Sequence, residues 1–85
     1  MDRLDAMESF VAVADSGSFT KAAQIRGVSR PSISRAVATL EDAIGAQLLI
    51  RTTRTVSLSR VGEHYLEDCR TILDAGRESM DTARG

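Results

Sequence analysis

The chain has 85 residues, of which 42% are hydrophobic and 27% charged, with a formal net charge of −1. This length allows one domain with a small core. A single cysteine excludes an internal disulfide framework and indicates a reducing compartment such as the cytoplasm. No apolar run approaches the roughly 18 residues of a membrane span, and the N-terminus MDRLDAMESF carries acidic residues, so neither a membrane span nor a secretory signal is predicted.

The charge is distributed unevenly along the chain. Residues 1–19 carry a net charge of −3, residues 20–60 carry +5, and residues 61–85 carry −3. A polyanion responds to the local field, because charges beyond a Debye length of about 8 Å are screened at physiological salt. The overall charge of −1 therefore does not exclude nucleic acid as a partner of the middle segment.

A first helix is predicted at about residues 3–16. Its apolar residues recur at helical intervals, and Ser16-Gly17 follows as a stop signal. The residues of this apolar face are Leu4, Met7, Phe10, Val11 and Ala14.

The segment 19–40, FTKAAQIRGVSRPSISRAVATL, predicts two short helices joined by a tight turn. Ser18 is a predicted N-cap of the first of them. Ala22 and Ala23 allow another helix to cross closely, and Gly27 can take the left-handed conformation that ends the helix. Two helices joined in this way are typical of a helix-turn-helix that presents its second helix to DNA.

The second helix of this pair should begin after the N-cap Ser29, with Pro31 in its first turn, and end at Gly45. Its apolar positions are Val28, Ile33, Val37 and Leu40, of which the last three have helical spacing and form a predicted inner stripe. The polar residues Arg30, Ser34 and Arg35 lie on or beside the outer face near its N-terminal end, where a recognition helix meets base edges. An ordinary helical hairpin with a solvated polar face is the alternative.

A two-stranded hairpin is predicted next, with strands at residues 47–50 and 55–58. A hairpin that follows a helix-turn-helix is a wing. Arg54 at its tip and Arg51 at its base would lie beside DNA, where an arginine meets the enhanced negative potential of a narrow minor groove. A solvated loop is the alternative.

A long last helix is predicted from about residue 60 to 83, with Ser59 as its N-cap. Its apolar seam has coiled-coil spacing and is widened by Leu66 and Leu73. The seam consists of Val61, Tyr65, Cys69, Ile72, Gly76, Met80 and Ala83. A second copy of the chain would cover the distal part, and a frayed tail is the alternative.

Catalysis, a metal site and a cofactor are not predicted. His64 and Cys69 are five residues apart on one predicted helix, which places them on different faces. No second histidine or cysteine could complete a site, and no Gly-rich phosphate loop occurs in the sequence.

With these motifs in order, the chain resembles the N-terminal DNA-binding domain of LysR-type transcriptional regulators. The resemblance rests on GSFTKAA, VSRPSISRAVATLE, IGAQLLIRTTR and SLSRVGE, which cover most of the chain. It implies a mainly α fold, a winged helix-turn-helix at residues 1–58 with a three-helix core, followed by a dimerisation helix at residues 59–85. It also implies double-stranded DNA with an interrupted palindromic operator as partner, with a dimer here and a tetramer in full-length members.

The resemblance also implies a role for individual residues. Arg30, Pro31, Ser34 and Arg35 would read bases from a recognition helix at about 30–44, and Arg54 would enter the minor groove from the wing at 51–55. The residues expected at phosphates are Ser18, Thr20, Lys21, Ser29, Ser32 and Arg51. The residues expected at the dimer interface are Val61, Tyr65, Cys69, Ile72, Leu73, Gly76 and Met80.

The sequence departs from the family pattern at three positions. Arg26 replaces a usual leucine, so either Ile25 takes the inward position or Arg26 extends its charge outward beside the basic face. Leu49 and Ser59 replace an aromatic residue and a threonine, which changes no functional expectation. The effector-binding domain of full-length members is absent from these 85 residues, so no inducer site is expected in them.

A winged-helix module that binds an acidic protein is the competing hypothesis. Charge alone does not separate it from a DNA-binding domain, because both interactions weaken with salt.

Overall fold

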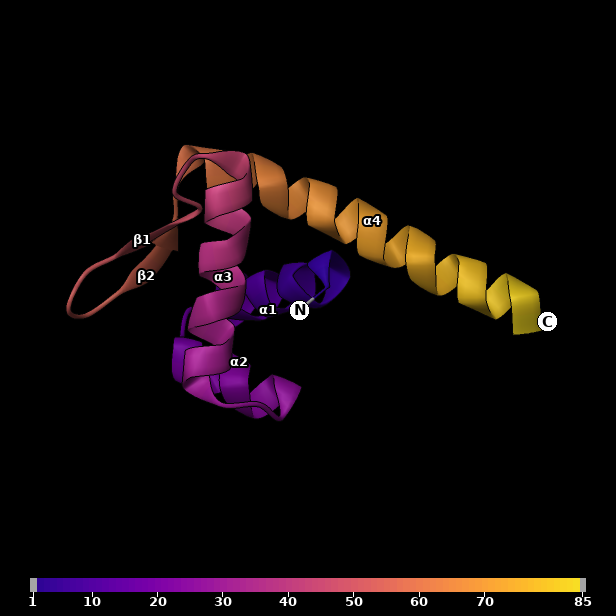
Figure 1. The fold of residues 1–85 in the computed structure, drawn as a ribbon, viewed down its shortest axis with the longest axis horizontal. Helices are drawn as coiled ribbons and strands as arrows, with labels where there is room; N and C mark the ends of the chain where they lie inside the picture. Colours follow the sequence, from indigo (N-terminus) through magenta and orange to yellow (C-terminus); the bar gives the residue numbers. More distant parts are fainter. Residues whose placement is uncertain (1, 85) are drawn as a thin grey trace.

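The computed structural model describes residues 2–84, without the side chains of residues 81, 82 and 84. The predicted fold is confirmed: three helices and a two-stranded wing are followed by one long helix (Figure 1). The elements are α1 (Arg3–Ser16), α2 (Phe19–Arg26), α3 (Arg30–Ile44), β1 (Leu49–Arg51), β2 (Val56–Leu58) and α4 (Arg60–Arg84).

Side-chain caps define the starts of the three core helices. The Asp2 carboxylate accepts a hydrogen bond from the Asp5 N–H at 2.8 Å, and Ser18 Oγ accepts one from the Lys21 N–H at 3.1 Å. Ser29 Oγ does the same for Ser32 at 3.2 Å. Gly27 ends α2 with φ of 67°, a left-handed conformation that a residue with a Cβ rarely adopts. These local signals fix the short turn that separates α2 from α3.

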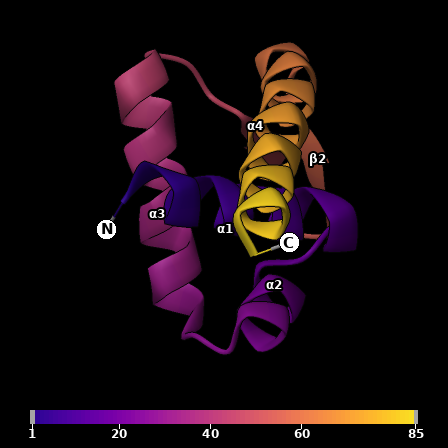
Figure 2. The ribbon, with the colours of Figure 1, turned by 90° about the vertical axis from the view of Figure 1, so that its right-hand side faces the viewer.

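The core lies where α1, α2 and α3 meet, and α4 covers one side of it (Figure 2). Its largest fully buried side chains are Phe10, Ile33, Leu40, Leu48, Val13, Val37 and Cys69. Two apolar residues lie at its margin: Leu4, in the first turn of α1, is 53% exposed, and Val28, in the predicted turn between α2 and α3, is 43% exposed.

The wing is an antiparallel pair in which Leu49 faces Leu58 and Arg51 faces Val56. β1 begins two residues later than predicted, because the Leu48 N–H is already bonded to Glu41 Oε2 at 2.8 Å and its side chain is buried. β2 also begins one residue later than predicted. The preceding residue belongs to the turn at the tip, where its carbonyl accepts a hydrogen bond from the Thr52 N–H at 2.9 Å.

Helix α4 packs on the core over its first turns and then extends away from it (Figure 1). At Gly62 a Cβ would overlap the carbonyl oxygen of Leu48, so only glycine allows this close approach. The Tyr65 ring lies 5.7 Å from the Phe10 ring, and Cys69 is fully buried. The prediction that Cys69 lies at a dimer interface is therefore wrong, because this chain's own core encloses the thiol.

Candidate nucleic-acid interface

Helix α3 exposes the polar side of its N-terminal half. Ile33 and Val37 face the core, whereas Pro31 and Arg35 are exposed and Ser34 is half-buried. Arg30 is also exposed, but five residues separate it from Arg35, which is about 140° around an α-helix. The two arginines therefore lie on different flanks of α3, with Pro31 between them.

The Arg35 side chain is held by a short chain of polar contacts along α3. Ser29 Oγ lies 2.8 Å from Ser32 Oγ, and Arg35 Nη2 donates to Ser32 Oγ at 3.4 Å. The hydroxyls of Ser29 and Ser32 thus already have partners within the helix. The sequence predicts these two serines as phosphate contacts. In the structure, their position also allows them to orient the Arg35 side chain.

Arg30 faces the side of α3 that is turned toward the wing. Its guanidinium carbon lies 6.0 Å from the centre of the Phe19 ring, and that of Arg51 lies 4.2 Å from the same ring. Phe19, the first residue of α2, is only 4% exposed. One aromatic ring therefore brings residues from α2, α3 and β1 together, and the sequence reasoning missed this contact.

A polar groove runs between the start of α2 and the tip of the wing. Its charged lining residues are Arg30 and Arg54, both positive. The complete lining consists of Gly17, Ser18, Phe19, Thr20, Arg30, Thr52, Thr53, Arg54, Thr55 and Val56. The groove brings the predicted wing arginine and one predicted base-reading arginine to the same channel.

The tip of the wing is closed by the side chain of Thr52. Its Oγ1 accepts hydrogen bonds from the N–H groups of Arg54 at 3.2 Å and Thr55 at 2.9 Å. The Arg54 side chain is exposed. The tip thus has an ordered backbone from which one arginine extends.

The predicted phosphate contacts on α2 divide into two kinds. Thr20 and Lys21 are exposed in the first turn, where free N–H groups and the helix dipole favour an anion. The Ser18 hydroxyl, in contrast, is occupied as the N-cap. Ser18 therefore presents the helix end rather than a free hydroxyl.

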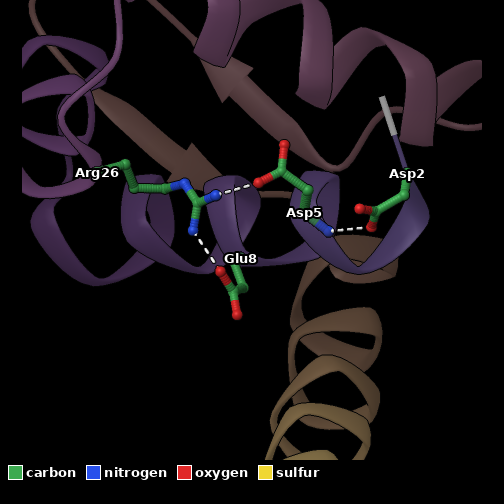
Figure 3. A network of polar contacts seen from close by, with 4 residues as sticks. All are labelled: Asp2, Asp5, Glu8 and Arg26. Carbon is green, nitrogen blue, oxygen red and sulfur yellow. Dashed lines mark hydrogen bonds and ion pairs between the residues drawn. The ribbon is translucent and has the colours of Figure 1, made fainter.

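Arg26 occupies neither of the two orientations expected from the sequence. It pairs with Asp5 and Glu8 of α1, its side chain is only 18% exposed, and Ile25 is 69% exposed (Figure 3). Two carboxylates compensate the buried guanidinium, although Arg26 Nε has no partner among the described residues. Asp5 and Glu8 are three residues apart and so share a helix face, which is the signal that could have predicted this pairing.

The distal part of α4 leaves apolar side chains uncovered. Ile72 is 45% exposed and Met80 57%, and Gly76 is exposed too; in the first turn, Val61 is 42% exposed. A groove between α1 and α4 is lined by Leu4, Glu8, Ile72, Leu73, Gly76, Arg77 and Met80.

Burial raises the pKa of the Cys69 thiol, so this cysteine is a poor nucleophile.

The described residues lack two further features. They contain no group of three or more histidine, cysteine or acidic side chains that could hold a metal ion. None of their helices has the length and apolar character needed to cross a membrane.

Comparisons with known proteins agree with this geometry. Residues 4–63 match the model of the bacterial regulatory helix-turn-helix protein, lysR family. The whole chain is 44% identical to an HTH-type transcriptional repressor of Pseudomonas aeruginosa, of which it spans 27%.

Solved structures superpose closely on the chain. The crystal structure of the CbnR_DBD–DNA complex matches with a TM-score of 0.91 and 37% identity, covering 99% of this chain and 95% of that one. The BenM_DBD/catB site 1 DNA complex matches with a TM-score of 0.92 and 31% identity, covering 99% and 92%. The chain therefore belongs to the LysR family of bacterial transcriptional regulators and carries that family's winged helix-turn-helix DNA-binding domain.

Proposed function

We propose that this chain binds a specific double-stranded DNA site, with α3 in the major groove and the wing at the adjacent minor groove, and so regulates transcription in the bacterial cytoplasm. The observation that carries the proposal is the positive groove between α2 and the wing. Arg30 lines this groove and is also the first residue of α3, so the groove continues into the exposed N-terminal half of that helix. A sugar-phosphate backbone fits such a groove, because arginines and a helix N-terminus both bind phosphate.

Each residue in this interface has a proposed role. Arg30, Pro31, Ser34 and Arg35 contact base edges, and Arg54 enters the minor groove. Ser18, Thr20, Lys21, Ser29, Ser32 and Arg51 are the proposed phosphate-side residues. No catalytic step or cofactor is part of this function, in keeping with relatives that are named as transcriptional regulators.

Residues 1–58 are proposed as the DNA-binding unit and residues 59–85 as the helix through which two chains pair. The exposed apolar residues of α4 support this pairing, since an uncovered face of this kind favours a second helix. A two-fold dimer would place two α3 helices in successive major grooves, about 10 base pairs or a multiple of that apart. The operator would then be an interrupted palindrome.

The DNA-binding proposal is tested on a duplex selected from a random pool and shortened to one half-site, so that pairing does not contribute. We expect Arg35→Ala to weaken binding by about 1–3 kcal/mol, the value of one good base contact. Arg77→Ala removes the same charge from α4, at a residue that is 72% exposed, and should leave affinity unchanged.

Two outcomes would contradict the DNA interface. One is equal affinity of the wild type and the Arg35→Ala variant for the selected half-site. The other is tighter binding to polyglutamate than to any duplex, which would favour the acidic-protein alternative.

Pairing is tested by sedimentation of the 85-residue chain with and without the complete palindrome. Ile72→Asp places a charge on the exposed apolar face of α4 and should give a monomer. Thr71→Asp adds the same charge at the neighbouring exposed residue outside that face and should remain a dimer. The same mass for the wild type and both variants would contradict pairing through α4.

A further inference from the structure

The wing has little structure of its own to hold it in place. Each strand has three residues, and an isolated pair of this size is marginally stable in water. Leu49 is buried, and Val56 and Leu58 pack against the core, so apolar contacts hold the base of the hairpin. Among the described residues, the tip turn forms hydrogen bonds only within itself, through Thr52 and Thr55. Between base and tip, a further contact is needed to fix where the tip lies.

Arg51, the last residue of β1, makes such a contact. Its guanidinium carbon lies 4.2 Å from the centre of the Phe19 ring, well within the roughly 6 Å limit for a cation–π interaction. Phe19 is a rigid anchor, because it is the first residue of α2 and is almost fully buried. The contact therefore joins the end of a short strand to the packed core.

The same ring also lies beside the head of α3. Arg30 approaches it at 6.0 Å, and Arg30 and Phe19 both line the groove that the wing tip closes on its other side. The Phe19 ring thus contacts both Arg51 of the wing and Arg30 in the first turn of α3.

We propose that Arg51 is a positioning residue, whose stacking on Phe19 fixes the width of the groove and the location of Arg54 relative to α3. This inference rests on the proposed DNA-binding function and assigns different roles to the two arginines of the wing. Arg54 contacts the minor groove, whereas Arg51 places Arg54 there. A simple phosphate contact by Arg51 would not depend on the aromatic face of Phe19.

A double-mutant cycle separates a positioning role of Arg51 from a direct phosphate contact. DNA affinity is measured for the variants Arg51→Gln and Phe19→Leu and for the double variant. Leucine keeps an apolar side chain at the buried position but removes the aromatic face. If Arg51 acts through the ring, each single change should weaken binding about three- to fivefold, and the double variant should lose no more than either single one. Minor-groove protection beside the half-site should disappear in all three variants, while major-groove protection by α3 remains.

A matched cycle controls for general loss of packing. Phe10 is the other phenylalanine of the chain, fully buried and stacked on Tyr65 rather than on Arg51. The effects of Phe10→Leu and Arg51→Gln should therefore multiply. If the effects of Phe19→Leu and Arg51→Gln also multiply, or if Phe19→Leu leaves DNA affinity unchanged, the positioning role is refuted.

A measurement without DNA keeps this inference separate from the proposed function. The Arg51 side-chain protons should show upfield ring-current shifts in the NMR spectrum, and Phe19→Leu should abolish these shifts. Random-coil shifts in the wild type would overturn the stacking, whatever the DNA experiments give. If the wild type shows the ring-current shifts but binds no DNA sequence specifically, the proposed function is contradicted instead.

Discussion

The two ends of α2 use arginine in opposite ways. At the N-terminal end, Arg51 and Arg30 lie around Phe19 and leave their positive charge beside an open groove. At the C-terminal end, Arg26 is enclosed between α2 and α1 and pairs with two carboxylates. One end leaves its charge beside the proposed DNA-binding groove, and the other uses charge to hold two helices together.

This difference shows that a regional charge sum is not a surface potential. Residues 20–60 carry a net charge of +5, but Arg26 is neutralised within the fold by residues of the acidic segment 1–19. Asp15, also from that segment, pairs with Arg70 of α4 at 2.6 Å. The acidic residues of α1 therefore have structural partners, and the positive charge of the proposed DNA interface comes from Lys21, Arg30, Arg35, Arg51 and Arg54.

The largest expected effect on stability is at the C-terminal end of α2. Arg26→Ala should lower the free energy of unfolding by about 2 kcal/mol, because Asp5 and Glu8 lose their partner but are themselves only partly buried. Denaturant unfolding measures the loss, with the exposed pair Arg77–Asp74 as control: Arg77→Ala should change stability by less than about 0.5 kcal/mol.

The same Arg26→Ala variant also tests the charge assignment. Its DNA affinity should fall with salt as steeply as that of the wild type, because Arg26 contributes no phosphate contact. A salt slope reduced by about one would place Arg26 on the DNA side and remove the contrast between the two ends.

A smaller loss of stability is expected at the N-terminal cap. Ser18→Ala should cost about 1 kcal/mol in thermal or denaturant unfolding, because the Lys21 N–H loses its acceptor. Ser18→Asn retains a capping oxygen and should restore most of the loss. Equal destabilisation by both substitutions would show that the hydroxyl has a role other than capping.

The smallest stability effect is expected at Lys21, whose side chain is exposed in the first turn of α2. Lys21→Ala should change the free energy of unfolding by less than about 0.5 kcal/mol. Its DNA salt slope should nevertheless decrease by about one, since one phosphate contact is lost. An unchanged slope would remove Lys21 from the interface.

Much of the fold could be predicted because its signals are local. Ser18, Ser29 and Gly27 mark helix ends through bonds to residues no more than four positions away, and apolar periodicity located α3 and the long α4. The contacts that were missed are long-range. Arg26 of α2 pairs with residues of α1, and Arg51 of β1 contacts Phe19 of α2. These partners are far apart along the chain, and apolar periodicity carries no information about such contacts.

The same limit explains the error at Cys69. Its place on the apolar seam predicted a pairing face, but its burial depends on which neighbouring element reaches it. Helix α4 packs far enough along α1 to enclose Cys69, whereas Leu4 stays 53% exposed. The proposed DNA residues depend mainly on local structure, because a helix N-terminus and a wing tip are defined by local turns.

The close approach of Gly62 to Leu48 holds the first turn of α4 against the core, so a small change of angle there displaces the far end of the helix. Its 25 residues span about 37 Å at 1.5 Å per residue, so a rotation of about 5° at the first turn would move the far end by about 3 Å. That displacement is close to the 3.4 Å rise of one base pair. In the proposed dimer, the seating of the first turns of α4 on the core, through Gly62, Tyr65 and Cys69, would therefore set the separation of the two half-sites.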